Sequence, residues 1–286
     1  MTRSLPLAKF QASGNDFLLV DELDAPEGPL DVPALCDRWT GVGADGLIRV
    51  GRASGDRYRF DLTNADGSRA EMSGNGVRCL AAFLRDRGVI TSGSEVEVVT
   101  IAGTRRVVVG EHDATVSMGI PNFTKASIPM RGAAWETFLA QPFEIGGGLT
   151  LTASALNMGN PHLVLFTDDD PARYHLEHLG PALENHELFP ERTNVEFARI
   201  ASDGDGDGAA IEVRVWERGV GETLACGTGA CAVAVAANEA GLVPTSVTVL
   251  FRGGPLSVRR LPDGEVLLAG PVRHVFDATV DTDALS

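Results

Sequence analysis

The chain contains an internal repeat, and this repeat constrains its fold more than any other feature. The segment SGNGVRCLAAFLRDRGVI (73–90) aligns with CGTGACAVAVAANEAGLV (226–243). At one offset of 153 residues (226 minus 73), Ser73 aligns with Cys226, and the glycines of both segments also coincide. Each segment predicts a turn of small residues, then an apolar helix that ends at a glycine suited to positive φ. Such a repeat predicts two similar structural units.

The pattern of β-rich runs repeats as well. EVEVVT and RRVVV follow the first predicted helix, and SVTVLF and LSVRR follow the second. A Gly-Asn pair at 14–15, before the first helix, recurs at 159–160 before the second. We therefore predict an α+β protein of two pseudo-symmetric domains, each a curled, mostly antiparallel sheet around one central helix.

The boundary between the predicted domains lies near Pro121. The first domain comprises residues 1–120 and is completed by residues 272–286, in which VRHVFDATV is typical of a returning strand. The second domain comprises residues 121–271. Two domains of about 140 residues agree with the usual size of a domain with its own core.

The starts of the two predicted helices are candidate binding elements. Free backbone N–H groups and the positive end of the helix dipole gather there. Two such starts facing each other would bind an anionic group from two sides, so we expect an active site in the cleft between the domains. Ser73 and Cys226 would then lie beside the ligand. Because a thiol at a helix N-terminus has a lowered pKa, we expect Cys226 to be partly ionised near neutral pH.

Two acid/base groups on opposite faces of a bound α-amino acid could remove the α-proton from one face and return one on the other. This is racemisation or epimerisation without a cofactor. The main electrostatic task is to stabilise the negative charge that develops on the carboxylate. Four backbone N–H groups at the helix starts would do so, those of Gly74, Asn75, Gly227 and Thr228.

Six stretches of the chain support this reading: SGNDFLLVD (13–21), GVGADGLI (41–48), NADGSRAEMSGNGVRC (64–79), NMGNPHLV (157–164), LGPALENHELFPERTNVEF (179–197) and VWERGVGETLACGTGACA (215–232). In sequence and order they resemble the diaminopimelate epimerase family of the pyridoxal-independent amino acid racemases. The resemblance implies interconversion of LL- and meso-2,6-diaminopimelate in lysine and cell-wall precursor synthesis. It implies a small-molecule substrate, no cofactor and no metal, and it is compatible with a homodimer.

The resemblance also implies roles for individual residues. Cys226 matches one of the family's two cysteine acid/bases, and Ser73 stands where the other belongs. His162 and Glu217 match groups beside the acid/bases. Substrate-binding positions, with Arg218 on the distal carboxylate, match Asn15, Asn64, Asn160, Asn194, Glu217 and Arg218. A position that often holds glutamine in the family falls on Gly46.

Ser73 is the main departure from the family pattern, because a hydroxyl is much less acidic than a thiol with its reference pKa of about 8.5. Three readings stay open. His162 activates the serine, as in serine–cysteine pairs of related hydroxyproline enzymes; the serine was introduced and disables a normal epimerase; or the protein uses another substrate or one base. The alternative functions are a related racemase or epimerase for another amino acid, and an impaired or silent amino-acid-binding homologue.

Composition excludes several other classes of protein. The net charge of −15 argues against nucleic acid as a partner. No apolar run reaches the roughly 18 residues that a membrane span needs, and the start does not resemble a signal peptide. Four cysteines form neither a disulfide framework nor a zinc pattern, which favours a cytoplasmic protein. DGDGDG (203–208) resembles a calcium loop, but its twelfth position is Arg214 rather than glutamate, so no metal is expected.

Overall fold

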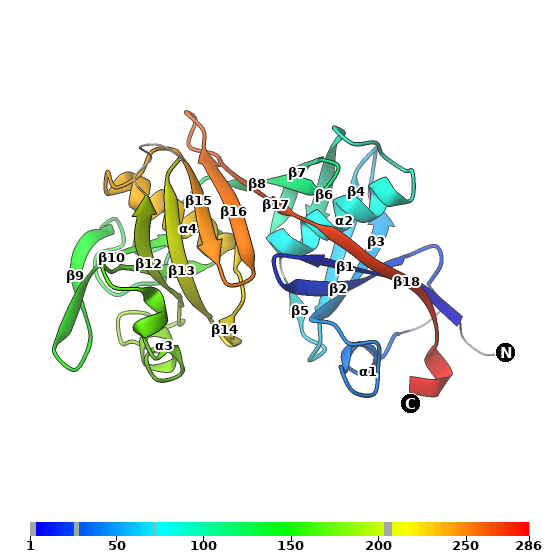
Figure 1. The fold of residues 1–286 in the computed structure, drawn as a ribbon, viewed down its shortest axis with the longest axis horizontal. Coiled ribbons are helices and arrows are strands. Elements are labelled where there is room, and N and C mark those ends of the chain that lie inside the picture. Colours follow the sequence, from blue (N-terminus) through cyan, green and yellow to red (C-terminus); the bar gives the residue numbers. More distant parts are fainter. Residues whose placement is uncertain (1–3, 26–28, 71, 203–207, 286) are drawn as a thin grey trace. The chain divides into compact units, whose positions relative to one another are not determined.

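The computed structural model describes residues 4–25, 29–70, 72–202 and 208–285. The chain divides into two compact units (Figure 1). Unit 1 comprises residues 1–117 and 269–286, and unit 2 comprises residues 118–268. The boundaries expected from the sequence, after residues 120 and 271, lie three residues further along the chain.

Unit 1 contains one mixed sheet and a central helix. Its helices are α1 (Val32–Cys36), α2 (Gly74–Asp86) and the 3-10 helix η2 (Thr282–Leu285). Its strands are β1 (Ser4–Ala12), β2 (Asn15–Asp21), β3 (Gly46–Arg52), β4 (Tyr58–Asn64), β5 (Arg69–Ala70), β6 (Glu95–Thr100), β7 (Gly103–Val109), β8 (Asp113–Gly119) and β18 (Arg273–Asp281). The first boundary between the units falls within β8, after Ser117.

Most strand pairs in unit 1 are antiparallel. Strand β18, from the end of the chain, pairs with β1, which pairs with β2 on its other side. Antiparallel pairs also join β3 to β4, β4 to β5, β6 to β7, and β7 to β8. Two pairs are parallel, β2 with β3 and β4 with β6.

Unit 2 contains the corresponding elements. Its helices are the 3-10 helix η1 (Pro171–Arg173), α3 (Leu176–Glu184) and α4 (Gly227–Glu239). Its strands are β9 (Phe138–Gly146), β10 (Leu149–Asn157), β11 (Pro161–Phe166), β12 (Asn194–Ser202), β13 (Ala210–Glu217), β14 (Gly221–Thr223), β15 (Ser246–Phe251) and β16 (Gly254–Arg260). Strand β17 (Val266–Pro271) contains the second boundary between the units.

The strand pairing of unit 2 repeats that of unit 1. Strands β10 and β11 are antiparallel, β11 and β12 parallel, β12 and β13 antiparallel, β13 and β15 parallel, and β15 and β16 antiparallel. Strand β9 pairs with β10 as β18 pairs with β1. The predicted fold class, α+β with two pseudo-symmetric and mostly antiparallel units, is therefore confirmed. The two parallel pairs in each unit add a detail that the sequence did not predict.

The central helices match each other in length and in both ends. α2 and α4 each have 13 residues, with Ser73 and Cys226 at their N-caps. In each, the N-cap side chain accepts a hydrogen bond from the backbone N–H three residues on. Gly88 and Gly241 follow the last turns with φ of 70° and 72°. Only glycine adopts this left-handed conformation without strain, which confirms the predicted helix ends.

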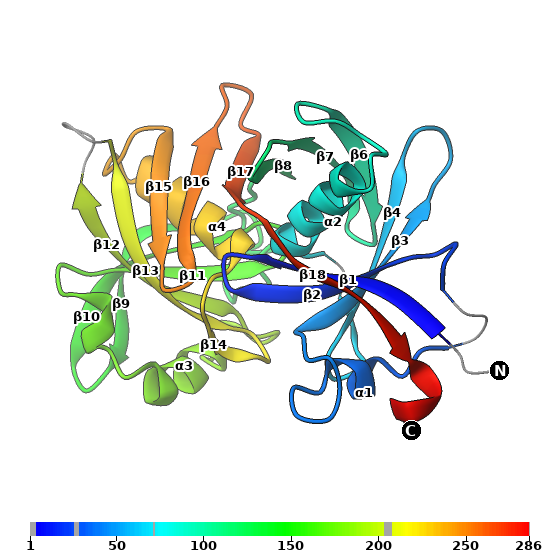
Figure 2. The same ribbon diagram turned by 45° about the vertical axis from the view of Figure 1, so that its right-hand side comes forward.

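Both central helices are buried against the sheets of their own units (Figure 2). α2 contacts β1, β2, β3, β4 and β7, and α4 contacts β10, β11, β12, β15 and β16. Along α4 nearly every residue is buried, as expected of a helix that is apolar on all sides. The strands around each central helix therefore determine which side chains lie near its first turn.

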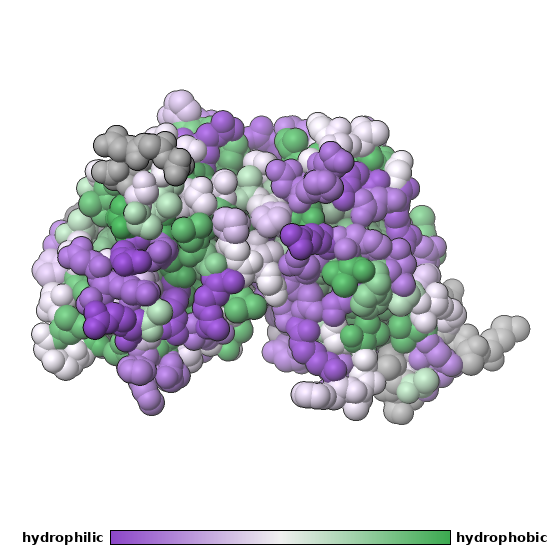
Figure 3. Space-filling model, viewed as in Figure 1, coloured by the Kyte–Doolittle hydropathy of each residue, from purple (hydrophilic) through white to green (hydrophobic). Residues whose placement is uncertain are grey.

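Hydrophilic side chains are spread over both units on the face that Figure 3 shows. No helix in the described part of the chain is long and apolar enough to cross a membrane. Strands β12 and β13 form an antiparallel pair on either side of the DGDGDG segment. Residues 203–207 of that segment lie outside the described residues.

Candidate functional site

The start of α2 is the first candidate element of the site. Ser73 is half-buried with an extended backbone, and its Oγ accepts a hydrogen bond from the Gly76 N–H at 3.0 Å. Gly74 and Asn75, which begin the helix, are buried. Serine is a good N-cap because its oxygen satisfies one of the free N–H groups of the first turn. The hydroxyl at this position thus has a structural task as well as any chemical one.

Asn75 connects the start of α2 to the first hairpin. Its Nδ2 donates a hydrogen bond to Asn15 Oδ1, and Asn15 Nδ2 donates to Asp45 Oδ2 at 3.1 Å. The guanidinium of Arg78, fully buried one turn into the helix, donates to Asn75 Oδ1 at 2.8 Å and to Ser13 Oγ at 3.1 Å. The structure therefore brings together Asn15, Asn75 and the helix start that carries Ser73.

Asn64 lies in a different hydrogen-bonded group. At the end of β4 its Nδ2 donates to Ser68 Oγ at 3.0 Å, within a turn. Gly46 is the register partner of Asn64 in the β3–β4 pair. A Cβ at Gly46 would lie 2.7 Å from the carbonyl oxygen of Thr63 and 2.9 Å from a methyl of Leu62. The backbone here has no room for a side chain, so any larger residue at position 46 would require the neighbouring strand to shift.

The start of α4 is the second candidate element. Cys226 is 5% exposed. Its Sγ accepts a hydrogen bond from the Gly229 N–H at 3.4 Å and lies 3.4 Å from Thr228 Oγ1. Gly227 is buried and Thr228 half-buried. The thiol occupies the place in α4 that the Ser73 hydroxyl occupies in α2.

Two carboxylates lie near the Cys226 thiol. Burial, followed by the charges of Glu217 and Glu196, raises the pKa of Cys226 well above its usual value. The hydrogen bonds from Thr228 and Gly229 act in the opposite direction but are outweighed. The sequence-based expectation of a lowered pKa is therefore wrong. Burial and the nearby carboxylates outweigh the helix start and favour the neutral thiol over the thiolate.

Glu217, at the end of β13, accepts a hydrogen bond from the Thr223 hydroxyl, and its carboxylate lies near enough to the Cys226 thiol for each to affect the pKa of the other. Burial raises the pKa of Glu217, and the charge of Glu196 adds to this effect. A carboxylate with a raised pKa next to a thiol is a suitable acceptor for the thiol proton. Cys226 and Glu217 thus form a pair between which a proton can move.

His162 on β11 is fully buried, and both of its ring nitrogens have partners. Nδ1 lies 2.7 Å from Glu196 Oε1, and Nε2 lies 2.9 Å from Asn160 Oδ1. Glu196 is fully buried on β12, the parallel neighbour of β11. Direct activation of Ser73 by His162 would require the loss of one of these two contacts.

Asn194 and Arg218 form a further group in unit 2. Asn194 is buried, its Nδ2 donates to the Pro161 carbonyl oxygen at 2.8 Å, and its Oδ1 accepts from the Arg218 N–H at 2.8 Å. The Arg218 side chain is half-buried and donates from Nη1 to the Glu191 carbonyl oxygen at 3.2 Å. No carboxylate among the described residues forms an ion pair with Arg218, so this cation is available for a ligand.

The other three cysteines are core residues, as predicted. Cys36, Cys79 and Cys231 are at most 2% exposed and reduced. Burial raises the pKa of Cys36 to about 11 and that of Cys79 to about 12. Cys79 lies on the same helix as Ser73, but its buried thiol stays protonated and cannot replace a reactive thiol at position 73.

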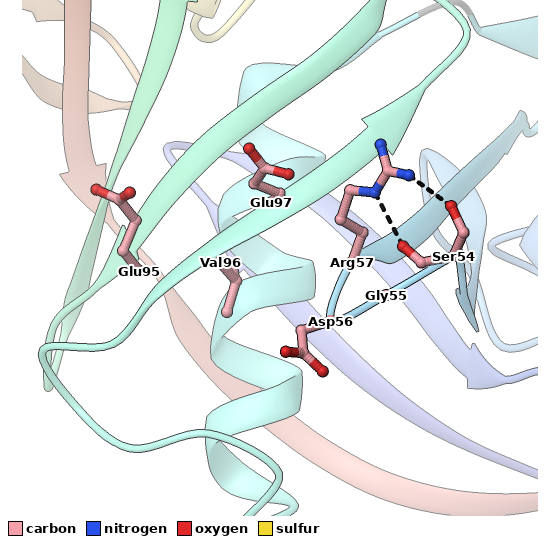
Figure 4. Close-up of a pocket in the computed structure, with 7 residues that line it drawn as sticks. All are labelled: Ser54, Gly55, Asp56, Arg57, Glu95, Val96 and Glu97. Carbon is pink, nitrogen blue, oxygen red and sulfur yellow. Dashed lines mark hydrogen bonds between the residues drawn. The ribbon is translucent and has the colours of Figure 1, made fainter.

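A hollow of about 510 Å³ elsewhere in unit 1 does not include the candidate site residues. It is lined by Ser54, Gly55, Asp56, Arg57, Glu95, Val96 and Glu97 (Figure 4). Arg57 turns onto Ser54 and donates to its carbonyl and hydroxyl oxygens. Within the described ranges no group of three or more histidine, cysteine, aspartate or glutamate side chains could hold a metal ion.

Comparison with known proteins assigns the chain to a family. The family model of diaminopimelate epimerase matches residues 7–124 and 154–275. The chain belongs to the diaminopimelate epimerase family. A diaminopimelate epimerase of Synechococcus sp. (strain JA-3-3Ab) is 42% identical over 290 residues, covering 98% of this chain and 99% of that protein. A diaminopimelate epimerase of Moorella thermoacetica (strain ATCC 39073 / JCM 9320) is 40% identical over 278 residues, covering 94% of this chain and 96% of that protein.

Solved structures with much lower sequence identity share the fold of this family member. A phenazine biosynthesis protein of the PhzF family from Bacillus anthracis has a TM-score of 0.69 at 13% identity and covers 97% of this chain and 99% of its own. A hydroxyproline epimerase from Agrobacterium vitis, solved with bound trans-4-hydroxy-L-proline, has a TM-score of 0.65 at 16% identity. The match covers 98% of this chain and 94% of that chain. These likenesses show the two-unit architecture alone.

Three polar residues that contact predicted site residues were not singled out from the sequence. Glu196 contacts His162, Arg78 contacts Asn75, and Asp45 contacts Asn15. A signal for Glu196 was present, because it interrupts the apolar run of VEFA (195–198) in a buried strand. Arg78 interrupts an apolar helix in the same way. A charged residue inside a buried run is rarely tolerated without a partner.

Proposed function

We propose that this enzyme epimerises LL-2,6-diaminopimelate to meso-2,6-diaminopimelate without a cofactor, in the synthesis of lysine and peptidoglycan precursors. The observation that carries the proposal is the near full-length match to diaminopimelate epimerases, which includes both helix starts. The chemical character of the start of α4 supports it: a capped thiol near a carboxylate of raised pKa.

The reaction needs one proton removed from the α-carbon and one returned on its opposite face. We assign these tasks to Cys226 and Ser73, with Glu217 exchanging a proton with the thiol and His162 supporting the site. As a neutral thiol, Cys226 is ready to give its proton to the carbanion. To abstract a proton, it must first lose its own, and the nearby Glu217 carboxylate, whose pKa is raised by burial, is the acceptor that we assign.

Substrate binding is assigned to polar groups in both units. The N–H groups of Gly74, Asn75, Gly227 and Thr228 would hold the reacting carboxylate, because N–H groups in the first turn of a helix lack partners within it. Arg218 would bind the distal carboxylate, with Asn15, Asn64, Asn160 and Asn194 around the remaining polar groups. The absence of a carboxylate partner for Arg218 among the described residues favours this role over a structural one.

We further propose a cytoplasmic location, which agrees with four free cysteines in the structure. The homodimer compatible with the resemblance stays a prediction. Sedimentation velocity tests it, because the chain mass is 30.1 kDa and a dimer has twice that mass.

The proposed function is tested by incubating the enzyme with LL-diaminopimelate and separating the stereoisomers on a chiral column. We expect the meso isomer to accumulate to equilibrium, and Cys226→Ala to abolish its formation. Turnover of another amino acid, such as 4-hydroxyproline, with none of diaminopimelate would favour the related racemase. Binding of diaminopimelate without turnover would identify an impaired or silent homologue, for which Ser73 is the specific reason.

A further inference from the structure

The glutamate at the end of α3 holds the turn that carries Arg218. Glu184 is buried, and both of its carboxyl oxygens accept hydrogen bonds. Oε2 accepts the indole Nε1–H of Trp216 at 2.8 Å, and Oε1 accepts the backbone N–H of Gly219 at 2.9 Å. In the chain, Trp216 and Gly219 stand on either side of the pair Glu217 and Arg218. One side chain of α3 therefore holds the turn between β13 and β14 on both sides of Arg218.

The same residue is also bonded to the segment that contacts the Arg218 side chain. Arg192 Nη1 donates to Glu184 Oε1 at 3.1 Å, and the Thr193 N–H donates to the Glu184 carbonyl oxygen at 3.2 Å. The carbonyl oxygen of Glu191, the residue before Arg192, accepts the hydrogen bond from Arg218 Nη1. The backbone turn and the carbonyl group that adjoin Arg218 are thus both connected to Glu184.

The hydrogen-bond roles around Glu184 follow from the chemistry of its partners. An indole N–H, a backbone N–H and a guanidinium can only donate, so both side-chain oxygens of Glu184 act as acceptors. A glutamine at this position would keep one acceptor oxygen and place an NH₂ group where the other oxygen stands. In either orientation of that amide, the Trp216 indole or the Gly219 N–H would face another donor and lose its hydrogen bond.

The close packing of α3 on Trp216 supports the same contact. Gly180 lies one turn before Glu184, on the same face of α3. A Cβ on Gly180 would overlap the Trp216 indole, at 2.5 Å from Cε3. The absence of a side chain at Gly180 lets the helix approach the ring, and this approach brings Glu184 within hydrogen-bond distance of Nε1.

We propose that Glu184 is a positioning residue that fixes the place of Arg218 and thereby sets the preference of the site for a ligand with a second carboxylate. It acts through Trp216, Gly219 and Arg192. The hold of Glu184 on these three groups is independent of the enzyme's reaction. The part concerning the ligand rests on the proposed function, in which Arg218 binds the distal carboxylate of diaminopimelate.

The first test is hydrogen exchange of the tryptophan indole N–H groups, followed by NMR of the ¹⁵N-labelled enzyme. The chain has three tryptophans, and two of them, Trp39 and Trp135, are 94% and 80% exposed. Trp216→Phe identifies the signal of Trp216. We expect the Trp216 N–H to exchange at least about tenfold more slowly than the other two, because it is donated to a buried group. Equal rates for all three would overturn the contact with Glu184.

Glu184→Gln tests the hold on both sides of the turn. The indole N–H of Trp216 or the backbone N–H of Gly219 should exchange at least about tenfold faster, because one of them loses its acceptor. Unchanged exchange at both groups would overturn the proposal. Glu177→Gln is the matched control, because Glu177 lies on the same helix, is exposed, and approaches His175 only to 3.7 Å. It should leave both exchange rates as they are.

The second test is calorimetric titration with meso-diaminopimelate and with an analogue that lacks the distal carboxylate. We expect Glu184→Gln to weaken binding of diaminopimelate at least about tenfold more than binding of the analogue, the effect of one misplaced charge-assisted contact. A merely destabilising change would weaken both ligands equally, and that result would overturn the role toward Arg218. Trp216→Phe removes one donor and keeps an aromatic ring, so it should give the same pattern at about threefold. It decides the question if Glu184→Gln does not fold.

Arg218→Ala shows whether Glu184 acts through Arg218. In this variant the preference for diaminopimelate over the analogue should already be lost, so adding Glu184→Gln should leave the ratio of the two affinities unchanged. A further fall in that ratio would show that Glu184 acts on the ligand by another route and would overturn the proposal. If the unmodified enzyme does not bind diaminopimelate at all, the proposed function fails, and the exchange rates still decide the structural role of Glu184.

Discussion

Replacing Ser73 by cysteine should make the enzyme faster and slightly less stable. The thiol is the stronger acid/base, and the equivalent position of α4 already shows how a cysteine caps this kind of helix start. Cys226 Sγ accepts the Gly229 N–H at 3.4 Å, whereas Ser73 Oγ accepts the Gly76 N–H at 3.0 Å. The variant should therefore keep the helix start with a longer and weaker capping bond.

The two effects have different sizes and opposite signs. Weakening an N-cap costs about 0.5–1 kcal/mol of stability, which lowers Tm by about 1–4 °C for a chain of this size. The epimerisation rate should rise at least tenfold, which corresponds to about 1.4 kcal/mol in the barrier. A change that only disturbed packing would lower both stability and rate.

The assay measures initial rates from LL- and from meso-diaminopimelate, together with exchange of the α-hydrogen with solvent. With serine at position 73, exchange on the Cys226 side should exceed inversion, and Ser73→Cys should bring the two rates closer. Ser54→Cys is the control for an added thiol, because Ser54 bonds to Arg57 in a distant loop. If the unmodified enzyme epimerises diaminopimelate rapidly and Ser73→Cys is slower, this reasoning is refuted. The serine would then be the better catalytic group at this position.

Three further predictions concern unit 2. Arg218→Lys should weaken diaminopimelate binding at least about tenfold more than binding of an analogue without the distal carboxylate, because lysine loses the bidentate geometry; equal losses in calorimetry would indicate a structural role. Gly229→Ala should lower Tm and activity, because its Cβ would lie 2.8 Å from Glu196 Oε1; unchanged values would contradict the packing of α4 on this carboxylate. In Glu217→Gln, exchange through Cys226 should rise about tenfold per pH unit through the neutral range, since without the nearby proton acceptor the thiolate of the buried Cys226 forms only as pH approaches a raised pKa; a plateau near neutral pH would indicate a lowered pKa.

The repeat was the part of the fold that the sequence predicted best. The start of each central helix, its C′ glycine and the mostly antiparallel sheets were all evident from one alignment of the two halves, because local signals determine helix ends. The two parallel pairs in each unit were not predicted. Runs of β-forming residues indicate where strands occur. Whether two strands pair parallel or antiparallel depends on the path by which the chain between them returns to the sheet.

The chemistry of the site was harder to predict, for a physical reason. The raised pKa of Cys226 comes first from burial and then from the charges of Glu217 and Glu196, which lie on neighbouring strands and are not part of the turn that carries the thiol. A prediction based on the helix start alone therefore gave a lowered pKa for Cys226, whereas the structure favours a raised one. Similarly, the partner of His162 is 34 residues away in the chain, and only the β11–β12 register brings the two side chains together.

The most direct test of the account is the reaction of LL-diaminopimelate in D₂O, followed by mass spectrometry and chiral separation. The account predicts that newly formed meso-diaminopimelate carries one solvent deuterium at the inverted α-carbon, and that Cys226→Ala forms neither the epimer nor the label. Protein that binds diaminopimelate but yields no meso isomer and no deuterated substrate would contradict the assignment of an acid/base role to Cys226 and Ser73.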